Sequence, residues 1–142
     1  MTFNYLRRIY LSDTDAAGVV YFAKGLEICH QAYEESLAET GINLNQTIQE
    51  GNIALPIVRA KIDFSRPIFL ADRIRVSLVA SLVSNNEFAI AYQISPFDNL
   101  EQILVRAQTK HVCIDPQTRK KISLPSTMLE WVNRFQSKKI QS

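Results

Sequence analysis

Asp13-Thr14-Asp15-Ala16-Ala17-Gly18-Val19-Val20-Tyr21-Phe22 is the stretch of this 142-residue chain that decides its fold. Two carboxylates lie two residues apart after a strand-like segment, a turn of small residues follows, and a helix then begins. This order can aim an acidic side chain and the free N–H groups of a helix N-terminus at one point. Such a point suits attack on a carbonyl, because the N–H groups stabilise the negative charge that develops on oxygen.

The residues after this stretch have the pattern of one long helix, over about 21–40. Apolar side chains recur at steps of four, three, four and four, and polar residues fill the positions between them. Gly41 is well placed to end the helix. A short second helix or an ordered loop is expected over 43–51. The apolar stripe of the long helix consists of Phe22, Leu26, Cys29, Tyr33 and Leu37.

In the rest of the chain, apolar and polar residues alternate with a period of two, which is typical of strands. A first strand is expected over 3–11, and a short helix over 126–136 closes the chain. Turns are expected at 84–87 and 95–99. Together these elements predict an α+β fold in which an antiparallel sheet covers the stripe of one central helix. The later strands are expected over 58–64, 74–82, 88–94 and 103–114.

Length and composition indicate a single domain over 1–142, with a frayed tail at 137–142. Hydrophobic residues make up 46% of the chain, enough for a core, and the net charge of +2 is too balanced to suggest nucleic acid or a membrane as partner. No apolar run approaches the roughly 20 residues that span a bilayer, and the first residues do not resemble a signal peptide, so we expect a cytoplasmic protein. Cys29 and Cys113 are expected to be reduced, buried thiols. With two histidines and no paired Cys/His spacing, a zinc site is not expected.

The motif Asp13-x-Asp15-Ala16-x-Gly18-Val19-Val20-Tyr21, followed by a helix and long strands, resembles the hotdog-fold acyl-CoA thioesterases of the 4-hydroxybenzoyl-CoA thioesterase branch. The resemblance covers nearly the whole chain, from about 5 to 131. It is closer to the cyanobacterial 1,4-dihydroxy-2-naphthoyl-CoA thioesterases, on the residues 12–15, 18–22 and 29–34. It implies a sheet wrapped round a long helix, subunits paired as dimers or tetramers with active sites between them, and hydrolysis of an aromatic acyl-CoA in phylloquinone or menaquinone biosynthesis. No metal or redox cofactor is implied, since coenzyme A is part of the substrate.

The resemblance assigns the catalytic role to Asp15, as nucleophile or as general base. Taken alone, an Asp before a helix is as readily a capping or turn residue. Asp13 is expected to be the structural acid of the pair. Phe22 would supply its backbone N–H to the thioester oxygen, and Gly18 would let the loop turn and the substrate approach. Tyr21 is expected to pack or to line the acyl pocket.

His30 stands where other relatives carry an acid, and it either reads the aromatic acyl group or is a partly exposed helix histidine. His111 is expected to be a satisfied sheet histidine, and Cys29 a protonated thiol that is no nucleophile. Phe22 replaces the His of the thioesterases associated with Tol-Pal genes, which favours a bulky acyl group. Candidate cations for the phosphates of CoA, among which the sequence does not choose, are Arg59, Lys61, Arg66, Arg106 and Lys110.

The alternative functions are a thioesterase for 4-hydroxybenzoyl-CoA or for short-chain acyl-CoA, and a module that binds acyl thioesters without hydrolysing them. Pocket size separates the two enzymes, because a naphthoyl group needs more room than one ring or a short chain. An intact Asp15 and Gly18 argue against the non-catalytic module.

Overall fold

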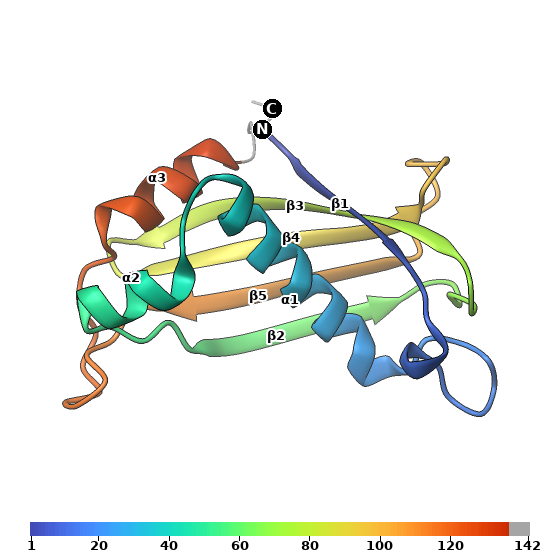
Figure 1. The fold of residues 1–142 in the computed structure, drawn as a ribbon, viewed down its shortest axis with the longest axis horizontal. Helices are drawn as coiled ribbons and strands as arrows, with labels where there is room; N and C mark the ends of the chain where they lie inside the picture. Colours follow the sequence, from blue (N-terminus) through green and yellow to red (C-terminus); the bar gives the residue numbers. More distant parts are fainter. Residues whose placement is uncertain (137–142) are drawn as a thin grey trace.

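The structure, a computed structural model, describes residues 1–136. The frayed tail predicted at 137–142 lies outside the described residues. Five strands form one antiparallel sheet in the order β1-β3-β4-β5-β2, and the long helix α1 crosses one face of it (Figure 1). In chain order the elements are β1 (Phe3–Arg8), a 3-10 turn η1 (Leu11–Asp13), α1 (Phe22–Glu39), α2 (Leu44–Gly51), β2 (Ile57–Phe64), β3 (Arg73–Ser84), β4 (Glu87–Pro96), β5 (Val105–Val112) and α3 (Ser126–Arg134).

The helix α1 buries most of the stripe that the sequence predicts. Cys29, Tyr33 and Leu37 are buried and Leu26 is half-buried. Phe22 is an exception, because its side chain is 65% exposed. The prediction that Phe22 belongs to the core is therefore wrong, since the first turn of α1 carries its ring past the packed layer.

The sheet meets α1 with the predicted alternation on its central strands. On β3, Ile74, Val76, Leu78 and Ala80 are buried, and their neighbours in sequence are not. The edge strand β2 differs: no residue of it is buried, although its sequence alternates. A single copy of the chain leaves most of this edge strand exposed.

Several predicted boundaries move by a few residues. The first strand ends at Arg8 rather than at 11, because the chain turns into η1. The two-residue turn between Ser84 and Glu87 is confirmed, whereas the 95–99 turn is a longer connection between Pro96 and Val105. The region 43–51 does form a helix, and α3 ends at Arg134.

The helix α3 closes one end of the layer that α1 and the sheet enclose. The indole N–H of Trp131 donates to Ser36 Oγ at 2.9 Å, and the N–H of Ala80 donates to the Phe135 carbonyl at 2.7 Å. The α+β prediction, an antiparallel sheet wrapped round one long helix as in the hotdog fold, is confirmed. No helix within residues 1–136 is long and apolar enough to cross a membrane.

Candidate active site

Asp13 anchors the loop that enters the site. Its carboxylate accepts two hydrogen bonds from the Arg7 guanidinium, at 2.7 and 3.0 Å, and one from the Tyr10 N–H at 2.9 Å. Asp13 is only 3% exposed. The hydrogen bond from Arg7 holds the pKa of the Asp13 carboxyl below its usual value, against the effect of burial. The structure thus gives Asp13 the structural place that the sequence predicts.

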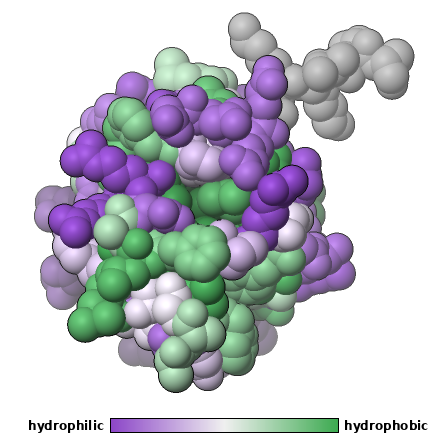
Figure 2. Space-filling view, turned by 90° about the vertical axis from the view of Figure 1, so that its right-hand side faces the viewer, coloured by the Kyte–Doolittle hydropathy of each residue, from purple (hydrophilic) through white to green (hydrophobic). Residues whose placement is uncertain are grey.

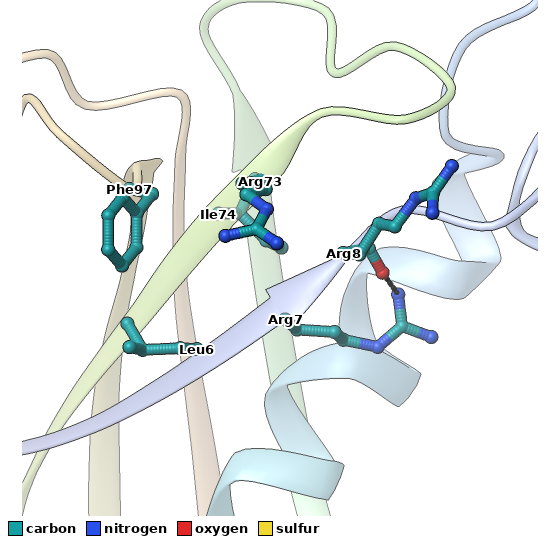
Figure 3. Close-up of a pocket in the computed structure, with 6 residues that line it drawn as sticks. All are labelled: Leu6, Arg7, Arg8, Arg73, Ile74 and Phe97. Atoms are coloured by element: carbon teal, nitrogen blue, oxygen red, sulfur yellow. Dashed lines mark hydrogen bonds between the residues drawn. The ribbon is translucent and has the colours of Figure 1, made fainter.

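Arg7 ties this loop to both neighbouring elements. It lies on β1, and its Nε donates to Gln31 Oε1 on α1 at 2.9 Å. Its Nη1 also donates to the carbonyl of Arg8 at 3.1 Å, as Figure 3 shows. Sequence reasoning missed this residue, because nothing in a strand pattern indicates that one arginine joins a loop to a helix.

Asp15 is the first residue of a tight turn, and it is exposed. The Asp15 Oδ1 accepts the N–H of Ala17 at 2.8 Å, and the Asp15 carbonyl accepts the N–H of Gly18 at 3.0 Å. Its own N–H donates to the Val19 carbonyl at 2.9 Å, so the turn closes on itself. The carboxylate therefore forms a local turn, as the structural alternative expects, and is still open to solvent on its remaining lone pairs.

Gly18 adopts the left-handed conformation that this turn needs. Its φ is +80°, in a region that other residues rarely occupy. A Cβ at Gly18 would meet nothing within 4 Å. Its importance is consequently conformational, and Gly18 itself does not line the pocket described below.

The N-terminus of α1 follows the turn directly. The N–H of Tyr21 donates back to the Asp13 carbonyl at 3.0 Å, and α1 begins at Phe22 with Tyr21 as its N-cap. Because the first N–H groups of a helix lack intrahelical acceptors, the Phe22 N–H is available to a ligand. The rings of Tyr21 and Phe22 are in contact, with centroids 4.7 Å apart.

A pocket of about 360 Å³ joins Asp15 to this helix start. Its walls come from the motif loop and from the end of β2 with the segment that follows it. Figure 2 views this end of the molecule and shows hydrophobic residues gathered on its surface below a polar band. The pocket is lined by Asp15, Val19, Val20, Tyr21, Phe22, Phe64, Ser65, Arg66, Pro67 and Ile68.

The sequence analysis missed Phe64, whose ring forms one wall of this pocket and is 41% exposed. The strand pattern places Phe64 among the alternating residues of β2 but cannot show that β2 ends beside the motif loop. Gly25 was missed too. It is buried in α1, where a Cβ would come within 2.8 Å of Phe64 Cζ.

His30 does not line this pocket. It lies eight residues after Phe22 on α1, which is about 12 Å along the helix axis. Its Nδ1 is 3.7 Å from a Glu34 carboxylate oxygen, and its side chain is 43% exposed. Within one copy of the chain, the structure does not bring His30 to Asp15.

The remaining candidates behave as the sequence predicts. His111 is 1% exposed, and its Nε2 is 2.9 Å from Thr109 Oγ1. Burial lowers the pKa of His111 to about 4. Burial also raises the pKa of the Cys29 thiol to about 12, so that Cys29 is no nucleophile. Cys29 and Cys113 are both buried and unpaired.

Of the cations proposed for CoA, Arg66 lines the pocket that holds Asp15. Lys61 and Arg106 lie on the outer face of the sheet beside Asp63, away from this pocket. Lys110 is 3.9 Å from Glu87. Arg59 lies on the exposed edge strand β2. Within one copy of the chain, Arg66 is therefore the candidate cation that lies at the pocket.

A carboxylate, a helix N-terminus and an aromatic wall at one pocket suit the hydrolysis of a carbonyl compound. Residues 9–132 match the model of the thioesterase-like superfamily, and the chain belongs to that superfamily. The predicted family is confirmed.

Among curated relatives, the 1,4-dihydroxy-2-naphthoyl-CoA hydrolase of Microcystis aeruginosa is 50% identical over 129 residues, which is 90% of this chain and 91% of that protein. The enzyme of the same name from Crocosphaera subtropica is 46% identical over 136 residues, 96% of this chain and 98% of that protein. Among solved structures, a 1,4-dihydroxy-2-naphthoyl-CoA thioesterase from Synechocystis superposes with a TM-score of 0.88 at 44% identity, covering 94% of this chain and 96% of that one.

Proposed function

We propose that this chain hydrolyses 1,4-dihydroxy-2-naphthoyl-CoA to 1,4-dihydroxy-2-naphthoate and coenzyme A. One observation supports the proposed reaction: the solvent-exposed carboxylate of Asp15 and the first turn of α1 border the same pocket. The relatives named for this reaction support the substrate. The rings of Tyr21, Phe22 and Phe64 around the pocket also favour a flat aromatic acyl group.

In the proposed reaction, the thioester carbonyl oxygen accepts the Phe22 N–H, and the dipole of α1 adds to the stabilisation. Asp15 then acts in one of two ways. Its carboxylate attacks the carbonyl carbon and expels the CoA thiolate, and water hydrolyses the resulting anhydride. Alternatively it takes a proton from a water that attacks the same carbon, and the tetrahedral intermediate expels the thiolate. Both routes consume one water and move no electrons between redox partners, so the proposal needs no cofactor.

The other predicted residues have supporting parts in the proposal. Gly18 shapes the turn that presents Asp15, and the Tyr21 ring borders the acyl group. Because His30 lies away from the pocket of its own chain, we assign it to the site of a second copy, where it would meet the acyl ring.

A homo-oligomer, a dimer or tetramer of this domain, is part of the proposal. The edge strand β2 has an unpaired side, and Ile57 and Val58 are 43% and 54% exposed on it. Exposed apolar edge strands favour pairing with another strand. We therefore propose that β2 joins two copies, which would also cover its exposed residues.

The proposed reaction belongs to phylloquinone or menaquinone biosynthesis, and we place it in the cytoplasm. The unpaired, buried thiols of Cys29 and Cys113 are consistent with a reducing compartment.

Thiol release from a panel of acyl-CoA substrates tests the proposal. The panel contains 1,4-dihydroxy-2-naphthoyl-CoA, 4-hydroxybenzoyl-CoA, benzoyl-CoA and butyryl-CoA, each with wild type and with Asp15→Asn. We expect the highest kcat/KM for the naphthoyl substrate, and a loss of roughly 10²- to 10⁴-fold in Asp15→Asn. Asn keeps the acceptor for the Ala17 N–H, so the turn is preserved.

Asp115→Asn is the matched control, because Asp115 Oδ1 accepts the N–H of Gln117 at 2.8 Å in an equivalent turn remote from the pocket. It should retain full activity. A preference for 4-hydroxybenzoyl-CoA or butyryl-CoA would establish the alternative thioesterases. Unchanged turnover in Asp15→Asn would refute the role of Asp15, and an absence of hydrolysis on the whole panel would favour a binding module.

A further inference from the structure

Gly25 is in the interior of α1, where glycine costs about 1 kcal/mol relative to alanine. It does not have the positive φ that would demand a glycine, since Gly18 and Gly41 are the glycines with positive φ among the described residues. A side chain at this position would instead require neighbouring side chains to shift. A Cβ there would lie 2.7 Å from Ile62 Cδ1 and 2.8 Å from Phe64 Cζ, closer than the 3.0 Å that real Cβ atoms keep.

The atoms that fill this space belong to β2, which ends at Phe64. Phe64 lies opposite Val105 of β5, and its ring reaches under the first turns of α1 to abut Gly25. Gly25 and Phe22 are three residues apart, so they share a face of the helix. The absence of a side chain at Gly25 thus lets the Phe64 ring lie directly beside the helix N-terminus.

The same ring is a wall of the pocket that contains Asp15. A Cβ at Gly25 would require Ile62 Cδ1 and Phe64 Cζ to shift. Because Phe64 is 41% exposed and lines the pocket that contains Asp15, a shift of its ring would move a wall of that pocket. The position of this wall therefore depends on a contact between α1 and β2 that carries no reactive group.

We propose that Gly25 and Phe64 together determine acyl-group specificity: Gly25 seats the Phe64 ring, and the seated ring forms the flat wall against which a bicyclic aromatic acyl group lies. This inference rests on the proposed thioesterase function and goes beyond it by naming the residues that select the acyl group. Aromatic groups stack with ring centroids about 4.5–7 Å apart, so a displacement of the wall by about 1 Å disturbs the stacking of a second fused ring.

The test measures kcat/KM for 1,4-dihydroxy-2-naphthoyl-CoA and for butyryl-CoA in Gly25→Ala, Phe64→Leu and the double variant. We expect Gly25→Ala to lower the ratio of the two values roughly ten-fold, because misfit of about one methylene in a pocket has an effect of this size. Phe64→Leu removes the flat wall and should lower the ratio as well. In the double variant, the shorter Leu removes the contact with the Phe64 ring, and the other contact is with Ile62 Cδ1, the end of a flexible side chain. The ratio should therefore be no lower than in Phe64→Leu alone.

Gly51→Ala is the matched control, since a Cβ at Gly51 in α2 would be 3.6 Å from the nearest atom of Ile53, an ordinary contact. It should leave the ratio unchanged. Equal loss on both substrates in Gly25→Ala would overturn the inference, because it would mean that the helix N-terminus had moved. An unchanged ratio, or additive losses in the double variant, would overturn it too. A wild type that hydrolyses butyryl-CoA but none of the three aromatic substrates of the panel would instead refute the proposed substrate, and the specificity inference with it.

Discussion

Arg7 of β1 and Asp13 of η1 form a two-pronged ion pair, with N–O distances of 2.7 and 3.0 Å. The side chains of Arg7 and Asp13 are 11% and 5% exposed, so water screens the pair weakly. Since Arg7 also binds Gln31, this pair holds the loop before Asp15 against both the sheet and α1. The turn that carries Asp15 is thereby held by residues that have no part in the proposed chemistry.

Asp13→Asn should destabilise the fold by about 3 kcal/mol, because removal of one partner leaves the other charge buried and unpaired. The measurement is urea unfolding at pH 7. The folded pKa of Asp13 is lowered, so the stability from this pair is fully present above its ordinary value of 3.8 and is lost as the pH falls through the lower folded pKa.

The difference between wild type and Asp13→Asn should therefore be constant from about pH 5 to 8 and shrink in acid. Arg7→Met should be comparably destabilising at neutral pH. Arg8→Met is its control, because Arg8 neighbours Arg7 and forms no ion pair among the described residues. Equal stability of the two methionine variants would contradict this account.

Phe22→Pro should abolish most of the activity and leave the fold intact. Phe22 is the first helical residue of α1, a position where proline is favoured and whose N–H has no helical acceptor. Tyr21 already has φ −65° and ψ 139°, which a following proline permits. The substitution removes one N–H, and loss of one oxyanion donor costs about 10²–10³ in kcat.

Phe22→Ala distinguishes the role of the ring from that of the backbone N–H, because this variant lacks the ring and keeps the N–H. We expect a modest rise in KM for the aromatic substrate in Phe22→Ala, and the large fall in kcat in Phe22→Pro alone. Thermal unfolding checks that both variants remain folded. Equal kcat values in the two variants would rule out the Phe22 N–H as the oxyanion donor.

The sequence could predict those features that depend on local pattern. The stripe containing Cys29, Tyr33 and Leu37 follows from helical spacing, and the positive φ of Gly18 and Gly41 follows from the turns they occupy. The sequence could also place Asp15 beside the N–H of Phe22, because the motif loop and the start of α1 are contiguous in the chain.

What could not be predicted depends on which distant segments meet. Strand order is set by the packing of the whole sheet, so the sequence could not place the end of β2, and with it Phe64, beside the motif loop. In the sequence, Arg7 resembles any other residue of a strand, and its role becomes visible only when its partner Asp13 is located in the structure. The exposure of Phe22 likewise depends on how far the sheet extends beneath α1, which helical spacing does not report.

Val58→Lys should weaken the proposed oligomer. Val58 is 54% exposed on the edge strand β2, and a lysine there hinders edge-to-edge pairing. Light scattering after size exclusion should give a dimer or tetramer for wild type and a larger monomer fraction for the variant at equal concentration. Leu100→Lys is the control, because Leu100 is 55% exposed in the connection between β4 and β5, outside the strands. A monomeric wild type, or equal dissociation of both variants, would refute pairing through β2.

His111 should make the fold acid-sensitive. Burial lowers its folded pKa to about 4 from an ordinary 6.5, so the unfolded chain binds a proton more readily between these values. Stability from neutral His111 is fully present above about pH 6.5 and decreases as the pH falls toward 4, by about 3 kcal/mol in all.

The contacts that bury His111 are uncharged: Thr109 Oγ1 lies 2.9 Å from Nε2, and the Phe88 ring stacks on the imidazole with centroids 4.7 Å apart. Electrostatic repulsion from His30, on the facing helix α1, is a second and smaller cause of the lowered pKa of His111. His111→Gln retains a polar partner for Thr109 and cannot titrate, so its unfolding free energy should lose this part of the pH dependence. Urea unfolding at half-unit steps from pH 4 to 8 measures both slopes, and parallel curves for wild type and His111→Gln would show that His111 is not the group responsible.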